Sequence, residues 1–212
     1  MPDRRLSPAA RRAHLLDTAV RLAAGGDLLA VSVADIAAAA DVSEGLLYHY
    51  FPSKQALLEA AVQRAADQLL ADLTTAVLAP AAGSDPSPLG RLSAALDAYL
   101  DRVQADPTGW RALLAATSGE PARIAAELDA ATVGLLCHAL GVDKPGPGLR
   151  LLQAGWLALE RAACLSWLDN PALGRDAVRE LLLAVFGSSL AALAPHDEQL
   201  RGVIDRLGGA PG

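Results

Sequence analysis

Aromatic residues are scarce in this chain: two Phe, three Trp and three Tyr make up 4% of its 212 residues. A core with so few rings must be built from aliphatic side chains, and 52% of the residues are hydrophobic, with alanine and leucine dominant. β-branched residues are also sparse, and no stretch alternates between apolar and polar residues. Because alanine and leucine favour helices and strands favour β-branched and aromatic residues, the composition predicts an all-α protein.

Cysteines and long apolar runs are few as well. Cys137 and Cys164 are the only cysteines, which excludes a disulfide framework and suits a reducing cytoplasm. The longest apolar run, residues 181–194, has 14 residues and is shorter than the roughly 18 needed to span a bilayer. Asp17 and Arg21 interrupt the apolar segment near the N-terminus, so we expect no secretory signal. We therefore expect a cytoplasmic protein that does not associate with a membrane.

Motifs of catalysis and metal binding are missing too. No Ser-His-Asp arrangement or glycine-rich phosphate loop occurs in the context that it requires. Cys137 and His138 are adjacent, so on a helix they project about 100° apart, and no Glu-x-x-His pair is present. The sequence therefore predicts no enzyme, no metal site and no cofactor.

Positive charge is in deficit over the whole chain but not at its start. The net charge is −6, which by itself argues against nucleic acid as a partner. Residues 1–21, however, carry five arginines against two aspartates, and a surplus of five acidic charges lies beyond residue 60. An acidic body with a basic N-terminal arm is compatible with DNA binding.

Start and stop signals divide the chain into about nine helices. Ser7, Ser32, Ser43 and Ser53 are the expected N-caps of the first four, with Asp35 completing a capping box after Ser32. The first helix is expected to end at Gly25-Gly26, the third at Pro52 and the fourth near Ala79. Later helices are expected over residues 87–105, 107–119, 121–141, 148–169 and 171–193, and the tail after Pro195 could form one more.

The second and third helices have the spacing of a helix-turn-helix, with the bend at Asp41. Aspartate tolerates the left-handed backbone that such a bend requires. Leu47 and Phe51 lie four residues apart, so they share a face of the third helix, and we expect them to pack on Ile36 and Ala40. The opposite face carries Glu44, Gly45, Tyr48 and His49.

A glycine inside so short a helix is unfavourable. Gly45 costs about 1 kcal/mol relative to alanine. Close approach of the helix backbone to something outside the protein would account for it.

The segment Leu47-Tyr48-His49-Tyr50-Phe51-Pro52-Ser53-Lys54, preceded by VSVADIAAAADVSEG, resembles the signature of the tetracycline-repressor (TetR) family of bacterial transcription regulators. The resemblance covers about residues 10–60, and beyond them only the number and layout of helices are similar. It implies a three-helix DNA-binding domain, residues 1–52, and a helical ligand-binding and dimerisation domain, residues 53–212.

Carried over by position, the resemblance implies a DNA-binding face made of Ser32, Ser43, Glu44, Gly45, Leu46, Tyr48, His49 and Lys54. Tyr48 and Lys54 look like phosphate contacts, and Leu46 and His49 would lie beside base edges. Glu44 stands where the family often has a basic or neutral residue, and Leu46 where it has a small or polar one. These departures bear on the operator sequence.

The C-terminal helices supply two further sets of candidates. Large or polar residues on otherwise aliphatic helices are the candidate ligand contacts: Tyr99, Trp110, Leu114, Cys137, His138, Gln153, Trp156 and Glu160. A stripe on the last two long helices is the candidate homodimer interface: Leu159, Ala163, Trp167, Val178, Leu182 and Val185. The alternative for both sets is that they serve the core or surface of their own chain.

The expected function is that of a DNA-binding transcriptional regulator. Its partners would be palindromic operator DNA, a second copy of the chain and a small apolar ligand that releases the repressor from DNA. Two alternatives remain: an activator or ligand-independent regulator of the same fold, and a helical-bundle binding protein or enzyme that has lost DNA binding. Glu44 is the main support for the last.

Overall fold

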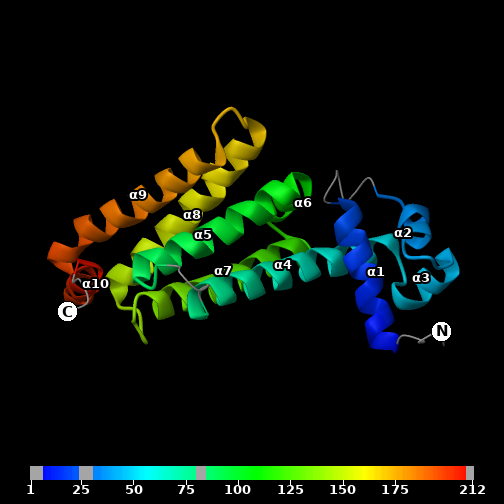
Figure 1. The fold of residues 1–212 in the computed structure, drawn as a ribbon, viewed down its shortest axis with the longest axis horizontal. Helices are drawn as coiled ribbons and strands as arrows, with labels where there is room; N and C mark the ends of the chain where they lie inside the picture. The colour runs from blue at the N-terminus through cyan, green and yellow to red at the C-terminus, as the bar shows by residue number, and fades with distance from the viewer. Residues whose placement is uncertain (1–6, 24–30, 80–84, 209–212) are drawn as a thin grey trace. The chain divides into compact units, whose positions relative to one another are not determined.

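A computed structural model of the chain describes residues 7–23, 31–79 and 85–208, and within these ranges every regular element is a helix (Figure 1). The all-α prediction is confirmed. The elements are α1 (Pro8–Ala23), α2 (Val33–Ala39), α3 (Glu44–Tyr50), α4 (Lys54–Leu78), α5 (Pro88–Ala105), α6 (Pro107–Leu114), α7 (Gly119–Ala139), α8 (Pro147–Asp169), α9 (Arg175–Leu193), a 3₁₀ turn η1 (Ala194–His196) and α10 (Glu198–Gly208).

The first four helices begin where the serine caps predict. The Oγ atoms of Ser7, Ser32, Ser43 and Ser53 each accept a hydrogen bond from the backbone N–H three residues later, at 3.0–3.2 Å. Ser32 and Asp35 form the predicted capping box. These bonds satisfy N–H groups that a helix start leaves without partners. The predicted helix end at Gly25-Gly26 and the arginines of residues 1–6 lie outside the described residues.

Helix boundaries at two connections, α6 to α7 and α8 to α9, differ from the predicted ones. α6 ends at Leu114 rather than near residue 119, and α7 starts at Gly119, whose φ of 73° favours glycine. α9 starts at Arg175 rather than after Pro171. Here the indole N–H of Trp167 donates to the Leu173 carbonyl at 3.0 Å, which holds the segment between α8 and α9 in a turn.

The chain divides into two compact units. The first contains residues 1–68 and 104–125, and the second contains residues 69–103 and 126–212. The start of α4 and all of α6 thus belong with the helix-turn-helix, whereas sequence alone suggested a boundary after residue 52. α4 and α7 each have residues in both units.

In the first unit, α1, α2, α3 and the start of α4 share an aliphatic core with one buried aromatic ring, that of Phe51. Its buried members are Leu15, Leu16, Ala19, Val33, Ile36, Ala37, Ala40, Leu47, Phe51, Leu57, Leu58 and Ala61. The predicted packing of Leu47 and Phe51 with α2 is confirmed by this cluster. The Arg12 guanidinium lies 4.9 Å from the centre of the Phe51 ring, a cation–π contact. An ion pair of 2.9 Å between Arg64 and Asp17 joins α4 to α1.

In the second unit α8 and α9 lie side by side, and α10 packs on both (Figure 1). Arg175 at the start of α9 reaches α5, with ion pairs of 3.0 Å to Asp97 and 2.7 Å to Asp101. α10 is fixed to the loop before α8, because the Gln199 side chain accepts from the Gly146 N–H at 2.7 Å and donates to the Lys144 carbonyl at 2.9 Å.

Candidate functional site

The two faces of α3 differ as the spacing predicts. Leu47 and Phe51 are 0% and 2% exposed, whereas Tyr48 is 45% exposed. Glu44, Gly45 and His49 are also exposed, and Leu46 is half-buried. α3 is therefore anchored through one face and presents a polar and aromatic face to the outside.

The bend before α3 is set by a backbone conformation that few residues adopt. Asp41 has a φ of 54°, and among the described residues other than glycine it alone has a positive φ. The left-handed conformation at this position, which the choice of aspartate predicted, is confirmed. It directs the chain into Ser43, whose side chain then caps α3 by accepting from the Leu46 N–H.

Ser32 and Ser43 are not equivalent as candidate phosphate contacts. The Ser32 Oγ accepts from the Asp35 N–H at 3.0 Å and also pairs with the Asp35 carboxylate at 2.6 Å. A phosphate at the start of α2 would have to displace that carboxylate. Ser43 uses its Oγ as an acceptor for the cap at 3.2 Å, so its hydroxyl proton can be donated outward. The structure thus favours Ser43 over Ser32.

Gly45 has no packing reason to be glycine. A Cβ added to it would meet a single atom of the protein within 4 Å, the Ser43 Oγ at 3.9 Å. His49 lies further along α3, with its ring edge-on to that of Tyr50 at a centroid distance of 5.4 Å. Lys54 is exposed at the start of α4. These residues form an open surface, which we call the α3 face: Ser43, Glu44, Gly45, Leu46, Tyr48, His49 and Lys54.

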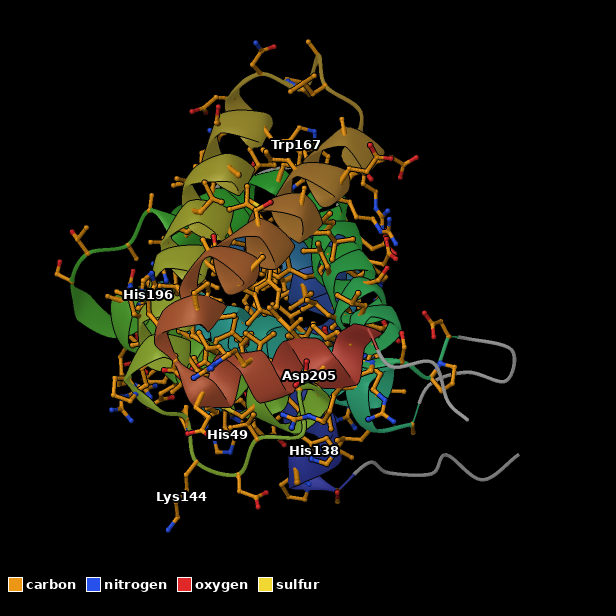
Figure 2. The ribbon with its side chains drawn as sticks, turned by 90° about the vertical axis from the view of Figure 1, so that its left-hand side faces the viewer. His49, His138, Lys144, Trp167, His196 and Asp205 are labelled. Carbon is orange, nitrogen blue, oxygen red and sulfur yellow. The ribbon has the colours of Figure 1, made fainter. Side chains whose placement is uncertain are left out.

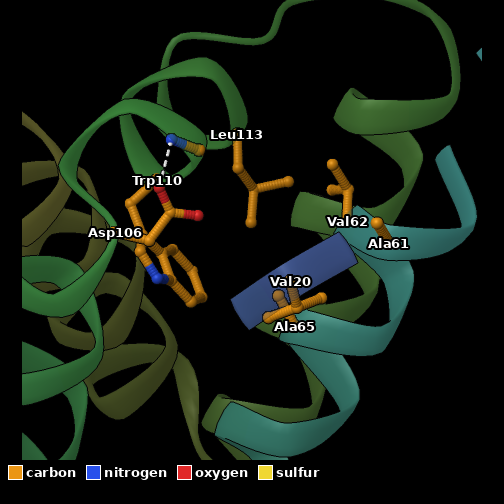
Figure 3. A pocket seen from close by; sticks show the side chains of 8 residues that line it. Val20, Ala61, Val62, Ala65, Asp106, Trp110 and Leu113 are labelled. Carbon is orange, nitrogen blue, oxygen red and sulfur yellow. Dashed lines mark hydrogen bonds between the residues drawn. The ribbon is translucent and has the colours of Figure 1, made fainter. Parts of the chain in front are cut away.

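The candidate ligand residues are divided between the two units. Trp110 and Leu114 are buried in the first unit with the helix-turn-helix. Trp110 lines a small cavity with Val20 of α1 and Ala61 and Ala65 of α4 (Figure 3). Its volume of about 20 Å³ has room for one water molecule at most. This cavity does not admit an organic ligand in the described conformation.

The other candidates belong to the second unit, where all but one are buried. Tyr99, Cys137, Gln153, Trp156 and Glu160 are buried, while His138 is exposed. The Trp156 indole N–H donates to the Leu182 carbonyl at 3.0 Å. The Trp156 ring lies edge-on to Phe186 at 5.6 Å.

Tyr99 and Glu160 form a buried polar cluster with Cys164, which sequence reasoning did not select. The Tyr99 hydroxyl hydrogen-bonds to the Glu160 carboxyl and to the Cys164 thiol. Burial raises the pKa of Glu160 to about 7, although the hydrogen bond from Tyr99 opposes the shift. Burial likewise raises the pKa of the Cys164 thiol to about 12. The position of Cys164, four residues after Glu160 on one helix, is the signal that could have identified it.

Three of the six candidate dimer residues are buried within their own chain, where they cannot contact a second copy. Trp167, Val178 and Leu182 are buried, and Figure 2 shows Trp167 where the adjoining ends of α8 and α9 meet. Leu159, Ala163 and Val185 are half-buried. The exposed faces of these helices carry other small and apolar residues: Leu151, Ala154, Ala158 and Ala162 on α8, and Ala177, Leu181, Ala184 and Ser188 on α9.

One helical stretch of the described residues, Arg175–His196, is long and apolar enough to cross a membrane by length and composition alone, with a mean hydropathy of 1.6. Only 28% of its most apolar window is buried in the chain. A single such helix is weak support for a membrane span, and it marks an apolar surface that the chain itself leaves uncovered. Within the described ranges no group of three or more His, Cys, Asp and Glu residues could hold a metal ion.

A helix-turn-helix whose second helix buries one face and exposes the other, followed by a larger helical unit, is the arrangement of a helix-turn-helix transcriptional regulator. The chain belongs to the tetR family of bacterial regulatory proteins. The model of that family matches residues 15–61, and the model of a tetracyclin repressor-like C-terminal domain matches residues 88–188.

Named relatives and a solved structure agree with this assignment. The chain is 34% identical over 187 residues to the HTH-type transcriptional repressor KstR of Rhodococcus jostii, covering 82% of this chain and 81% of that protein. It is 30% identical over 164 residues to the HTH-type transcriptional regulator BetI of Stenotrophomonas maltophilia, covering 75% and 81%. The crystal structure of a tetR-family regulator from Streptomyces coelicolor matches with a TM-score of 0.80 at 28% identity, covering 95% of this chain and 90% of the other.

Proposed function

We propose that this regulator is a cytoplasmic repressor that binds a palindromic operator as a homodimer and is released from it by a small apolar ligand. The observation that carries the proposal is the α3 face, which is exposed while the other side of α3 is fixed in the core by Leu47 and Phe51. The name of the relative KstR, a repressor, supports this direction of regulation.

On DNA, the residues of the α3 face take different roles. Tyr48 and Lys54 contact phosphates, and Ser43 donates its hydroxyl proton to a phosphate next to the start of α3. Leu46 and His49 reach base edges in the major groove, where a leucine can pack on a thymine methyl group and a histidine can donate or accept a hydrogen bond. Glu44 repels phosphate, so it favours a site where it accepts from a cytosine amine.

The homodimer is supported by the uncovered surface of α8 and α9. Exposed alanine, leucine and serine residues run along both helices, with few charged residues such as Glu180 among them. Small side chains allow two helices to approach closely. Leu151 and Leu181 are 65% and 50% exposed, respectively. A second copy that covers these leucines would remove apolar surface from water, which stabilises the dimer.

Release by a ligand requires that a change in the second unit reaches the α3 face. α4 and α7 have residues in both units, and α4 begins directly after the helix-turn-helix. A ligand that binds one conformer of the second unit better than another shifts the population of conformers. The favoured conformer then holds the two recognition helices of the dimer at a spacing that does not fit the operator.

The proposal is tested by fluorescence anisotropy with labelled DNA from the region upstream of the chain's own gene. The expected result is tight binding to one short segment, weak binding to a scrambled duplex of the same length, and release on addition of an apolar compound. A protein that binds such compounds but prefers no DNA sequence would be a helical ligand-binding protein instead, the alternative that Glu44 supports.

A further inference from the structure

The inward side of α8 carries polar side chains to which the proposed function assigns no role. Gln153, Trp156, Glu160 and Cys164 follow one another at intervals of three or four residues, so they share one face of the helix. All four are buried in the second unit, and Gln153 is only 2% exposed. An aliphatic interior with so few polar groups makes each of them conspicuous.

The buried polar groups of this interior can mostly accept hydrogen bonds. Gln153 and Glu160 are the buried polar or charged side chains among the second unit's described residues, apart from ring and thiol groups, and no lysine or arginine is buried with them. An ion pair of 2.6 Å between Arg161 and Asp129 lies near Glu160, and its two charges act on the carboxyl in opposite directions. Among the described residues, this interior therefore holds one carboxyl group and no buried lysine or arginine.

Gln153 leaves an acceptor without a partner. Its amide nitrogen donates to the Cys137 sulfur at 3.2 Å and lies 3.5 Å from the Val133 carbonyl oxygen. Its amide oxygen has no hydrogen-bond partner and is buried. In this orientation the amide nitrogen faces the Val133 carbonyl oxygen, to which an amide oxygen could not donate. An unpaired buried acceptor is unfavourable, and a donor from outside the chain would satisfy it.

Glu160 has no ion pair among the described residues, because the neighbouring Arg161 pairs with Asp129. The Tyr99 hydroxyl donates to it, but a phenol supplies one hydrogen bond and no charge. Because a buried carboxylate is stabilised by a paired cation, the surroundings of Glu160 suit a positively charged group. A carboxylate ligand at the same place would add a second negative charge and is disfavoured.

We propose that the ligand of the second unit is an apolar molecule with a protonated amine that pairs with Glu160 and a neutral hydrogen-bond donor that reaches the Gln153 amide oxygen. The two residues are seven positions apart, which is about 10 Å along the helix, so the two polar groups belong to opposite parts of an elongated molecule. This inference rests on the proposed function for the existence of a ligand, and it specifies the chemical class.

The test uses the full chain and three probes of equal length: decylamine, decanol and decanoic acid. Binding is measured by isothermal titration at pH 7.5, below micelle-forming concentrations, in 0.3 M salt, which screens the acidic surface. The amine is expected to bind at least tenfold more tightly than the alcohol, and the acid more weakly than either. This comparison needs no variant, so it holds even where a substitution impairs folding.

Two variants and one control assign the contacts. Glu160→Gln is expected to bring the amine within threefold of the alcohol while binding of the alcohol is retained. The control Glu127→Gln, an exposed carboxylate of α7 in the same unit, keeps the tenfold preference. Adding a terminal hydroxyl, as in 10-aminodecanol, is expected to tighten binding to the wild type but not to Gln153→Leu.

Several results would overturn the inference. They are an acid that binds as tightly as the amine, an amine preference that survives in Glu160→Gln, and the absence of binding by all three probes. Operator binding is measured on the same preparations. If the protein binds its operator but none of these probes, the inferred ligand class is wrong and the proposed role as a transcriptional regulator stands. If it binds no DNA, the proposed function itself is wrong.

Discussion

Replacing Gly45 with alanine separates folding from DNA recognition. In the protein alone the new methyl group meets only the Ser43 Oγ at 3.9 Å, so it fits without any movement. Alanine is the better helix former, and it also reduces the freedom of the unfolded chain. We therefore expect Gly45→Ala to stabilise the protein by about 0.5–1 kcal/mol.

The same methyl group should harm DNA binding. It projects from the exposed first turn of α3, on the face that carries Tyr48 and His49. Where that turn approaches DNA, the methyl group occupies space that only a glycine leaves open. We expect at least a tenfold loss of operator affinity, equivalent to about 1.4 kcal/mol.

The measurements are urea unfolding for stability and fluorescence anisotropy with operator DNA for affinity. Gly134→Ala is the matched control, because Gly134 is exposed in the middle of α7 and a Cβ there meets nothing within 4 Å. It should raise stability and leave DNA binding unchanged. Unaltered operator affinity in Gly45→Ala would refute the placement of Gly45 against DNA. A loss of stability would refute the claim that a methyl group fits at this position in the protein alone.

Three further predictions follow from the charges and exposed surfaces. Lys54→Ala should weaken binding to all DNA alike and lower the salt slope by about one per subunit, whereas His49→Ala should change the preferred bases; the reverse pattern would exchange their roles. Burial raises the pKa of Glu160 from 4.5 to about 7, so its contribution to stability is most favourable below pH 4.5 and is lost as the pH rises through 7. Relative to Glu160→Gln, the wild type should lose roughly 3 kcal/mol of unfolding free energy between pH 4.5 and 8, and a difference that does not change with pH would contradict the burial. Leu181→Glu should sediment as a monomer, whereas the control Leu78→Glu, at a residue with the same 50% exposure, should remain a dimer. If both variants are dimers, Leu181 does not lie in the dimer interface.

The first unit could be read from the sequence because its signals are local. Each serine cap lies three residues from the N–H that it accepts, and the pair Leu47 and Phe51 is one helical turn apart. Asp41 marked the bend for the same reason, since the residue type itself reports the backbone conformation.

The second unit could be read only in outline. Tyr99 and Glu160 are brought together by α5 and α8, and nothing near either residue in the sequence announces the other. On α9, residues of similar hydrophobicity face both inward and outward, so the pattern could not tell that Leu182 serves the core while Leu181 is half exposed. Trp110 was grouped with the ligand candidates by its size, yet it belongs to the first unit.

The central claim, that two copies of the α3 face bind one operator, is tested most directly by footprinting. The full chain is incubated with DNA from upstream of its own gene and digested with a nuclease. The predicted result is one protected, near-palindromic site whose half-site centres lie about one helical turn, roughly 34 Å, apart. Protection of a single asymmetric half-site, or of no sequence at all, would contradict it.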